Sequence, residues 1–460
     1  MEQVSLKFVA SASGGEIQSG SPETTVSRVC TDSRQARPGD LFFALAGELF
    51  DGHNFLAEAA HKGVAAVVVE RRKTPPLLNC GIIVVEDARG ALGRLAANYR
   101  RQFSLPVVAV AGSNGKTTTK ELLAAVLRQK MATVSSEASF NNDIGVPLTL
   151  LRLERAHEAA VLEAGTNHPG ELAPLIEMIQ PRHGVLTSIG REHLEFFGDL
   201  EGVAREEGCL AELLPDSGTL FLNGDSEWTP ILERRTKARV VRIGFGAGND
   251  WRAENVRVDL TGVTFRVVGP CPGFDADFRV KLLGRHQALN ALFAIAAGVE
   301  LGLSAGEIRR GLASCEPPKM RMQLHEVNGV RVLDDTYNAN VDSMLAALQT
   351  LRDLPCAGRR LAVLGDMAEL GESTEAAHAE VGRLSADYGI NCLVAIGRWA
   401  RQTADAARAA GLREVTEFSD VQAAAPEVKK MVREGDIVLL KASRASGLER
   451  ISEALRNGRG

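Results

Sequence analysis

The chain has 460 residues, of which 45% are hydrophobic and 24% charged, and its formal net charge is −5. At roughly 150 residues per domain, this length predicts about three domains of ordinary globular composition. The acidic balance argues against non-specific binding to nucleic acid, and seven cysteines without a CxxC pair indicate reduced thiols instead of a disulfide framework. Neither a secretory leader nor an apolar run of the ~20 residues that span a bilayer is recognisable, so we expect a cytoplasmic protein without membrane insertion.

The opening part of the chain, residues 1–104, predicts a small α/β domain. RPGDLFFAL and GVAAVVVE are short apolar runs bounded by glycine and proline, which is typical of strands. FLAEAAHKG and RGALGRLAANYRRQF have the pattern of helices, and SLP at 104–106 is a plausible linker into the next domain.

The middle of the chain, residues 105–315, alternates apolar strand candidates with helical patterns. The strand candidates are VVAVAG, AAVLEAG, HGVLTSIG and GTLFLNGD. This alternation predicts βαβ units and a parallel sheet. Residues 238–269 are rich in strands and turns and predict a small antiparallel insert, after which GRHQALNALFAIAAGVELG returns to a helix.

The segment GSNGKTT joins the first of these strands to a helix expected over Thr117–Arg128. Backbone N–H groups of a glycine turn and of a helix N-terminus form an anion site, Lys116 adds a positive charge, and the Thr117 hydroxyl can reach a magnesium ion. The GxxxxGK[ST] pattern would need glycine where Val110 stands, so Gly112 makes this a shortened variant. The alternative is an ordinary turn with a solvated lysine. The loop alone does not identify the reaction, because kinases, motor ATPases and ligases share it.

Acidic and imidazole groups follow later strands of the same domain. Glu163 ends one apolar strand, His193 lies just past another, and Glu206 and Glu207 belong to an expected helix. Ligands of open parallel sheets gather at the carboxyl ends of strands, so Glu163 and His193 could converge on the phosphate loop. Taken singly, each of these residues is explained as well by a solvated or structural role.

Beyond Pro317–Pro318, residues 316–460 predict a second doubly wound unit. GVRVLDDTY, GRRLAVLGDM, NCLVAIG and GDIVLLK again alternate with helices. The predicted fold class is therefore α/β with three domains: a central parallel-sheet P-loop ATPase domain, a Rossmann-like C-terminal domain and a smaller α/β N-terminal domain.

An ordered series of motifs from TDSR at 31–34 to KASR at 441–444 resembles the Mur ligase family of peptidoglycan synthesis. The series comprises AGSNGKTTTKE, SFNNDIGVPLTLL, EAGTNHPGEL, LTSIGREHLEFFGDLEGVAR, GRHQALNAL, PPKMRMQ, DDTYNANVDSM and LGDMAELGE. The resemblance implies an ADP-forming ligase that transfers the γ-phosphate of ATP to a carboxylate, so that an amine can attack the acyl phosphate. The last two motifs favour the family member that adds D-alanyl-D-alanine to UDP-N-acetylmuramoyl-tripeptide, with ATP as co-substrate and Mg²⁺ as cofactor.

The resemblance also implies site residues, carried over position by position. The implied catalytic group is Lys116, Glu163, His193 and Glu207, and the implied magnesium ligands are Thr117, Glu163, His193 and Glu207. The implied ATP contacts are Gly112, Ser113, Asn114, Gly115, Lys116, Thr117, Thr118, Asn290, Arg321, Asp335 and Asn338. The implied substrate contacts are Asp32, Ser33, Arg34, His53, Asn141 and Asn142. For the first-domain turns, a polar turn with a cap explains the residues equally well. KASR and LGDMAELGE are expected on the dipeptide side.

One departure from the family pattern concerns the metal. The family usually carries a carbamylated lysine fourteen residues after the metal-binding histidine, whereas that position here is Glu207. Our hypothesis is that a permanent carboxylate replaces the carbamate. The alternative is a solvated helix residue in a site that is impaired or differently organised. Gln287, Met320 and Val341 are milder departures near the expected ATP clamp.

Two further interpretations stay open at this point. The chain could be another Mur-type or folylpolyglutamate-like ligase, or a nucleotide-binding scaffold that catalyses nothing. The lysine, acid and imidazole set argues against a scaffold, which has little use for paired metal ligands. We expect a monomer whose domains close around ATP and substrate. The third residue of the tripeptide is not readable from the sequence.

Overall fold

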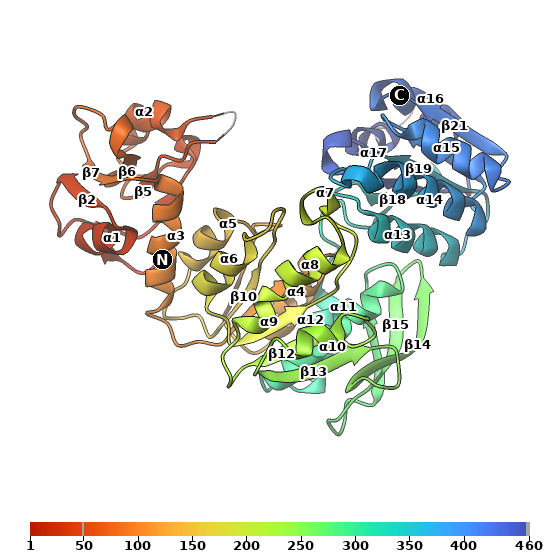
Figure 1. Ribbon diagram of the computed structural model, residues 1–460, viewed down its shortest axis with the longest axis horizontal. Helices are drawn as coiled ribbons and strands as arrows, with labels where there is room; N and C mark the ends of the chain where they lie inside the picture. Colours follow the sequence, from red (N-terminus) through yellow and green to blue (C-terminus); the bar gives the residue numbers. More distant parts are fainter. Residues whose placement is uncertain (48–49, 457–460) are drawn as a thin grey trace.

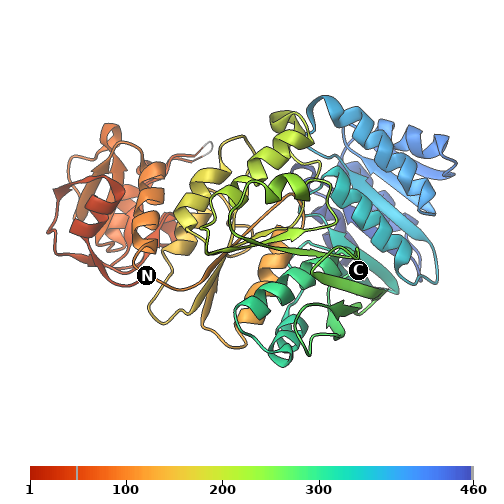
Figure 2. The ribbon, with the colours of Figure 1, turned by 60° about the horizontal axis from the view of Figure 1, so that its bottom comes forward.

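The computed structural model describes residues 1–47 and 50–456 and arranges them as three α/β units along the chain (Figure 1). The first and third units project from opposite ends of the central one, and a view turned by 60° shows the same order (Figure 2). Each unit has its own main sheet, of five, nine and six strands. The α/β fold class is confirmed, and each main sheet lies inside one predicted domain range.

The N-terminal sheet has the strand order β2-β7-β6-β5-β4 and is parallel except for β2, which pairs antiparallel with β7. Its strands are rich in buried β-branched residues, as a sheet covered on both faces requires. Helix α2 packs on one face, and α1 and α3 pack on the other. A separate two-stranded ribbon pairs β1 with β3. The bounds are β1 Val4–Ser5, α1 Leu6–Ser13, β2 Glu16–Ser19, β3 Thr25–Val26, β4 Val29–Cys30, β5 Leu41–Phe43, α2 Leu56–His61, β6 Ala66–Glu70, β7 Gly81–Val85 and α3 Ala88–Arg100.

The central sheet has the order β16-β15-β14-β13-β12-β11-β8-β10-β9, and its strands from β9 to β14 pair in parallel. The antiparallel strands expected over 238–269 are present, but they do not form a separate insert. β13 is parallel to β12, and β14, β15 and β16 extend the same sheet. The insert was therefore predicted wrongly, because turn composition does not reveal which sheet edge a hairpin joins. Strand bounds are β8 Val107–Ala111, β9 Thr133–Ser135, β10 Ala159–Glu163, β11 His183–Leu186, β12 Thr219–Asn223, β13 Arg239–Gly244, β14 Trp251–Asp259, β15 Gly262–Val268 and β16 Ala276–Val280.

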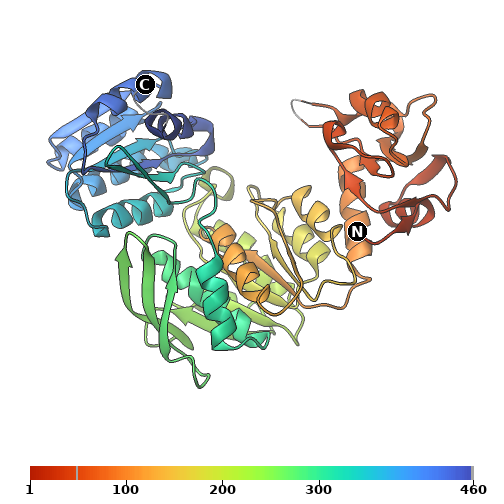
Figure 3. The same cartoon turned by 180° about the vertical axis from the view of Figure 1, so that it is seen from behind.

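Helices cover both faces of the central sheet. α4, α11 and α12 pack on one face, where Figure 3 shows α4 and α11 side by side, and α5, α6 and α9 pack on the other. Helix bounds are α4 Lys116–Leu127, α5 Gly145–Leu150, α6 Leu172–Ile179, α7 Leu194–Phe197, α8 Leu200–Glu207, α9 Cys209–Glu212, α10 Thr229–Glu233, α11 His286–Glu300 and α12 Ala305–Ser314.

The C-terminal sheet has the order β17-β18-β22-β19-β20-β21, parallel except for the β17–β18 hairpin. Helices α13 and α14 cover one face, while α16 and α17 cover the other, which gives the doubly wound arrangement predicted for this part of the chain. The bounds are β17 Gln323–Val327, β18 Val330–Asp335, α13 Val341–Asp353, β19 Arg360–Gly365, α14 Thr374–Asp387, β20 Cys392–Ile396, α15 Ala400–Ala409, β21 Glu414–Phe418, α16 Val421–Met431, β22 Ile437–Lys441 and α17 Glu449–Arg456.

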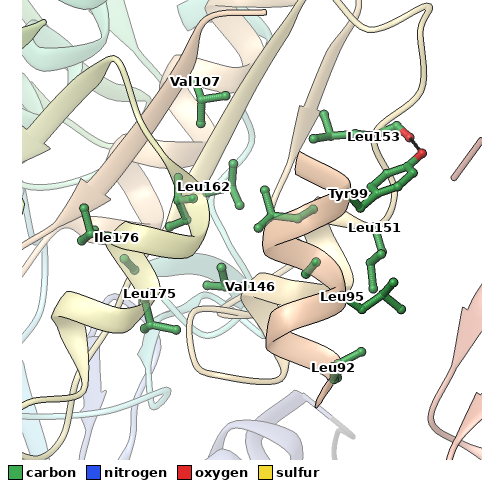
Figure 4. Close-up of a cluster of buried hydrophobic side chains, with 14 of the residues drawn as sticks. Leu92, Leu95, Tyr99, Val107, Val146, Leu151, Leu153, Leu162, Leu175 and Ile176 are labelled. Atoms are coloured by element: carbon green, nitrogen blue, oxygen red, sulfur yellow. Dashed lines mark hydrogen bonds between the residues drawn. The ribbon is translucent and has the colours of Figure 1, made fainter. Parts of the chain in front are cut away.

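Helix α3 joins the first two units through one continuous apolar core (Figure 4). Leu92, Leu95 and Tyr99 on α3 are fully or almost fully buried, and they belong to the same cluster as Val146 and Leu151 of the central domain. The Tyr99 hydroxyl donates a hydrogen bond of 2.7 Å to the carbonyl oxygen of Leu153. The N-terminal domain is therefore attached through close packing. Throughout the described part of the chain, no helix combines the length and apolar character that crossing a bilayer requires.

Candidate active site

A cavity of about 570 Å³ lies between the central and C-terminal domains. Both domains contribute to its wall, at the carboxyl ends of β8, β10 and β11 on one side and of β18 and β22 on the other. This is the edge at which ligands of open α/β sheets bind. The predicted residues that line it are Ser113, Asn114, Gly115, Lys116, Thr117, Thr118, Asn141, Asn142, Glu163, His193, Asn290, Arg321, Asp335 and Asn338.

The phosphate loop, residues 112–117, leaves a fully buried strand and enters α4 through two left-handed glycines. Gly112 has φ 112° and Gly115 has φ 88°. A Cβ atom at Gly112 would lie 2.5 Å from Thr187 Oγ1, and one at Gly115 would lie 2.5 Å from Asn290 Oδ1. Only glycine fits these two positions. The shortened motif therefore still forms the tight strand–turn–helix corner that the sequence predicted.

The segment after β11 supports this loop from the side. The backbone N–H of Ser113 donates to the carbonyl oxygen of Ser188 at 2.8 Å, and that of Asn114 donates to Ser188 Oγ at 2.9 Å. In return, the N–H of Gly190 donates to Ser113 Oγ at 2.8 Å. The phosphate loop and residues 188–190 thus form one hydrogen-bonded unit.

Lys116 folds back over its own loop. Its Nζ donates to the carbonyl oxygen of Gly112 at 2.5 Å and lies 3.5 Å from Glu192 Oε2. Burial opposes the positive charge, but the carboxylates of Glu192, Glu207 and Glu163 outweigh it, and the pKa of Lys116 is raised. The loop therefore holds a permanent cation at the position where a phosphate group would bind.

Thr117, in the first turn of α4, meets Glu163 at the end of β10. The Thr117 hydroxyl donates to Glu163 Oε1 at 3.1 Å, and Asn141 Nδ2 donates to the same oxygen at 2.9 Å. Glu163 is 1% exposed, and its other oxygen, Oε2, is buried without a hydrogen-bond partner. A buried carboxylate oxygen without a donor beside a hydroxyl suits a hard cation such as Mg²⁺.

Protein side chains alone do not complete a metal site. Among the residues that the structure describes, no three His, Cys, Asp or Glu side chains are grouped closely enough to hold an ion. Mg²⁺ commonly keeps water and takes substrate phosphate oxygens, with only one or two carboxylates from the protein. Thr117 and Glu163 fit that pattern, provided that a nucleotide supplies the remaining ligands.

His193 faces the C-terminal domain. It has φ 48°, and its Nδ1 lies 2.5 Å from Glu369 Oε2 on the LGDMAELGE segment. Since an ionised carboxylate only accepts, Nδ1 donates here, and Nε2 is the nitrogen that could ligate a cation. The backbone N–H of Glu195 also donates to the carbonyl oxygen of Glu369, at 3.1 Å.

Glu207 lies beneath the phosphate loop and is not among the residues that line the cavity. Its Oε2 accepts a hydrogen bond of 2.7 Å from the N–H of Gly112, and its Oε1 has no partner. Burial raises the pKa of Glu207 to about 8, helped by Glu192 and opposed by Lys116. The alternative of a solvated residue is wrong, because Glu207 is 1% exposed. Its predicted contact with a metal stays a prediction.

Glu192 was not recognised from the sequence, although it precedes His193 directly. It is 5% exposed, and its Oε1 has no hydrogen-bond partner. The only sequence signal for Glu192 was its place in the segment REH, and there the metal role was assigned to the neighbouring His193. Its pairing with Lys116 depends on two strands that meet only in the folded sheet.

The C-terminal wall is held by a buried ion pair. Lys441 Nζ lies 2.6 Å from Asp335 Oδ2 and donates to the carbonyl oxygen of Asn338 at 3.0 Å. The Arg321 guanidinium lies 4.0 Å from the centroid of the Tyr337 ring. Met320, one of the departures noted above, has φ 59°, a left-handed conformation that glycine adopts at less cost.

Asn290, Gln287 and His286 form a connected polar group at the N-terminal end of α11. Asn290 Nδ2 donates to Gln287 Oε1 at 2.9 Å, and its Oδ1 accepts from Thr119 Oγ1 at 3.3 Å. Gln287 Nε2 lies 3.0 Å from His286 Nε2, and burial lowers the pKa of His286 to about 4. An adenine contact by Asn290 would replace one of these internal hydrogen bonds.

Among the predicted site residues, those of the first-domain turns lie outside the cavity: Asp32, Ser33, Arg34 and His53. Gly112 also lies outside it. Asp32 accepts from the N–H of Arg34 at 3.0 Å, and its hydrogen bonds to the Arg34 side chain lower the pKa of Asp32 to about 2. His53 Nδ1 lies 2.7 Å from Asp51 Oδ1, and its Nε2 accepts from the N–H of Glu70. This geometry is that of capped polar turns, as the alternative interpretation expected. The role of these residues in binding substrate stays a prediction.

Comparison with known proteins is consistent with this geometry. Family models described as Mur ligase family catalytic domain, Mur ligase middle domain, and Mur ligase glutamate ligase domain match residues 25–100, 110–298 and 320–444. The chain is 36% identical over 464 residues to the UDP-N-acetylmuramoyl-tripeptide–D-alanyl-D-alanine ligase of Escherichia coli strain K12, covering 99% of each chain.

Two solved structures are also similar to the chain. The first is a crystal structure of MurF from Acinetobacter baumannii, with a TM-score of 0.90, 31% identity and 100% of each chain covered. The second is MurF ligase from Thermotoga maritima in complex with ADP, with a TM-score of 0.80 and 29% identity, covering 94% of this chain and 97% of that one.

Proposed function

The chain belongs to the Mur ligase family, and we propose that it joins D-alanyl-D-alanine to UDP-N-acetylmuramoyl-tripeptide in peptidoglycan precursor synthesis. The reaction is ATP-dependent and ADP-forming. The observation that carries the assignment is the phosphate loop, which presents Lys116 to a cavity whose opposite wall comes from a second domain. Full-length similarity to ligases of this specificity selects this reaction among those that use such a loop.

The first step is transfer of the γ-phosphoryl group of ATP to the terminal carboxylate of the tripeptide. A carboxylate is a poor acyl donor, and phosphorylation turns one of its oxygens into part of a leaving group. Negative charge builds on the transferring group, so catalysis depends on cations and on positioning. Lys116 supplies a fixed positive charge, and the N–H groups of the first turn of α4 orient the nucleotide phosphates, because those of Gly112, Ser113 and Asn114 already donate within the protein.

The second step is attack of the D-alanyl-D-alanine amine on the acyl phosphate, with loss of inorganic phosphate and formation of the new amide. An acyl phosphate that met bulk water would be hydrolysed, so the site must exclude water while it exists. Arg321, Asp335 and Lys441 form a wall from the C-terminal domain that can close over the reacting groups. The segments 364–372 and 441–444 are proposed to face the dipeptide.

Magnesium is proposed as the cofactor, with Thr117 and Glu163 as protein ligands on the nucleotide side and His193 Nε2 toward the acyl group. The bound ion would neutralise phosphate charge and polarise the transferring group. Asn141 supports this set, because its amide holds Glu163 Oε1 and leaves Oε2 free of protein donors. Asn142 lies on the same wall of the cavity and is proposed to contact the substrate.

Glu207 is proposed to support the cation site from beneath the loop. Its hydrogen bond to Gly112 fixes the first peptide of the phosphate loop. Burial raises its pKa to about 8, and a cation bound at the site would favour its ionised form. A glutamate needs no carbon dioxide to carry this charge. The substitution therefore makes the enzyme independent of bicarbonate.

Asp32, Ser33, Arg34 and His53 of the N-terminal domain are proposed to hold the UDP-linked end of the substrate. That domain is fixed to the central one through α3, so a long substrate would lie between a fixed binding site and the catalytic cavity. The remaining predicted ATP contacts line the cavity apart from Gly112, whose N–H is taken by Glu207. We further propose that the enzyme works as a cytoplasmic monomer.

The direct test is incubation with ATP, Mg²⁺, UDP-N-acetylmuramoyl-tripeptide and D-alanyl-D-alanine, followed by mass analysis of the product. Formation of the UDP-linked pentapeptide with one phosphate released per product supports the proposal. Product only with a single amino acid would indicate another Mur-type or folylpolyglutamate-like ligase. ATP binding without any product would indicate a scaffold. Parallel reactions with diaminopimelate- and lysine-containing tripeptides would identify the third residue.

A further inference from the structure

The central and C-terminal domains meet through a short segment that we call the docking loop, residues 188–195. Its main contact is Arg191, which lies between two carboxylates of the C-terminal domain. Nε and Nη2 of Arg191 donate to Asp342 Oδ1 at 2.9 and 2.7 Å, and Nη1 donates to Glu380 Oε2 at 2.7 Å. The backbone N–H of Arg191 donates to Asp342 Oδ2 at 2.7 Å. One residue thus makes four hydrogen bonds across the domain boundary.

The geometry around Arg191 is tight. Gly190 approaches Asp342 so closely that a Cβ atom there would lie 2.6 Å from Oδ2. The Arg191 side chain is 30% exposed, and those of Asp342 and Glu380 are 35% and 32% exposed, so water screens these pairs less than a fully exposed pair. Burial works against the charge, but both carboxylates outweigh it and raise the pKa of Arg191.

The docking loop transmits this contact to the catalytic side. Its first residues are hydrogen-bonded to the phosphate loop through Ser188 and Gly190, and its later residues include Glu192, which pairs with Lys116. His193 follows and contacts Glu369 of the C-terminal domain. A displacement of the C-terminal domain would therefore disturb groups beside the phosphate loop as well as remove the wall that carries Arg321 and Asp335.

We infer that Arg191 is a positioning residue that stabilises the arrangement in which the C-terminal domain lies against the phosphate loop. A bound nucleotide favours the same arrangement, because both walls of the cavity then contact it. Without the Arg191 contact, the C-terminal domain would spend only a fraction of its time in the competent position, and the apparent affinity for ATP would fall by that fraction. Once both walls close on bound ATP, the chemical step is unchanged.

The test compares Arg191→Met with Arg383→Met in the full-length protein. Arg383 lies on α14, the helix that carries Glu380. Within residues 1–47 and 50–456, its ion pair is with the exposed Asp387 of the same helix alone, so it is the matched control. We expect the KM for ATP to rise about tenfold in Arg191→Met, with kcat within about twofold of wild type. Arg191→Lys keeps the positive charge without the bidentate geometry, so its KM for ATP should lie between those of wild type and Arg191→Met. Arg383→Met should match wild type.

Hydrogen exchange of the nucleotide-free protein gives a readout that does not depend on catalysis. In Arg191→Met, amides in the docking loop and in the first turn of α13 should exchange faster, and saturating ATP should restore part of the protection. Asp342→Asn should resemble Arg191→Met, and the double variant should be no worse than Arg191→Met alone, because both remove the same contact. Melting temperatures check that every variant is folded.

This inference rests on the proposed function for its kinetic part, and the two can fail separately. If wild type formed no pentapeptide, the proposed function would fail, while the exchange data would still test the Arg191 contact. Unchanged KM and unchanged exchange in Arg191→Met would overturn the inference. A fall in kcat with unchanged KM would overturn it too, since that result would place Arg191 in the chemical step.

Discussion

Helix α3 joins the N-terminal domain to the central domain through buried side chains. The C-terminal domain meets the central one mainly through ion pairs and hydrogen bonds around a cavity, and Leu283 of the central domain also packs into the C-terminal apolar core. At the first junction, Leu95 and Tyr99 belong to a core that continues into the central domain. At the second, Arg191, His193 and Asn114 contact Asp342, Glu369 and Asn340, respectively.

The two junctions differ in what it costs to separate them. Opening an apolar, close-packed junction exposes buried surface and leaves voids, which destabilises the protein by several kcal/mol. Opening a polar junction exchanges protein hydrogen bonds for bonds to water, at a net cost of about 1 kcal/mol each. We therefore place the movement that function needs at the C-terminal junction and regard the N-terminal junction as fixed.

The largest effect is expected where the polar junction carries the chemistry. Lys116→Met removes the cation that we propose faces the transferring phosphoryl group, and ligation should fall on the order of a hundred- to a thousandfold. Phosphate release and pentapeptide formation measure it. Lys430→Met, at an exposed lysine on α16, is the control and should retain wild-type activity. Amide synthesis at the wild-type rate by Lys116→Met would contradict the assigned role of the phosphate loop.

The apolar junction should respond in stability and not in nucleotide affinity. Leu95→Ala leaves a void in the shared core and should lower the free energy of unfolding by about 2–5 kcal/mol, while the KM for ATP stays unchanged in the folded protein. Urea denaturation and steady-state kinetics measure the two effects. Leu77→Ala, at a leucine 84% exposed, should change neither. A raised KM in Leu95→Ala would show that this junction also positions the nucleotide.

Glu207, beneath the phosphate loop, should make the stability of the protein without nucleotide or metal depend on pH. Burial raises its pKa from an ordinary value of 4.5 to about 8. Between these values, the unfolded chain loses the proton while the folded chain keeps it, so its contribution to stability is complete below pH 4.5 and is lost as the pH rises to about 8.

Glu207→Gln removes this titration. Between about pH 5 and pH 8, the free energy of unfolding of Glu207→Gln should therefore rise relative to that of wild type, by on the order of 1 kcal/mol per pH unit at most. Its melting temperature should rise relative to wild type over the same range. Thermal unfolding across that range measures the difference. A difference that does not change with pH would mean that Glu207 is not held in its neutral form by burial.

The smallest expected effect concerns bicarbonate. Because Glu207 carries a carboxyl group without carbamylation, stripping bicarbonate from the assay and restoring it should leave the ligase rate unchanged. Glu207→Lys, assayed with and without bicarbonate, is the informative partner, since a lysine there could take up carbon dioxide. A strong bicarbonate requirement in wild type would exclude the replacement hypothesis.

Local patterns were sufficient to predict much of the fold. The apolar strand ending at Ala111 and the helix from Lys116 follow from local residue spacing. The tight turn between them was predicted from its two glycines, and in the structure a Cβ atom at either glycine would clash with a neighbouring side chain. The edge of the central sheet could not be predicted in the same way. Whether the strands over 238–269 join the central sheet depends on the pairing of β13 with β12, which aligns Arg239 with Thr219, and turn composition does not encode that partner.

The site shows the same division. Glu163 follows from its place at the end of β10, because parallel strands bring their carboxyl ends to one edge. Glu192 and Arg191 could not be found, since their partners Lys116 and Asp342 are distant in sequence and each contact depends on how two elements meet. The sequence placed Glu207 on a helix, its link to the metal came from a family resemblance, and its position beneath the phosphate loop required the structure.

The central claim is that the cavity between the central and C-terminal domains transfers the terminal phosphoryl group of ATP to a carboxylate. The most direct measurement uses UDP-N-acetylmuramoyl-tripeptide labelled with ¹⁸O in its terminal carboxylate, together with ATP, Mg²⁺ and D-alanyl-D-alanine. An acyl phosphate requires one labelled oxygen to appear in the released inorganic phosphate for each amide formed. Pentapeptide formed with unlabelled phosphate would contradict the account.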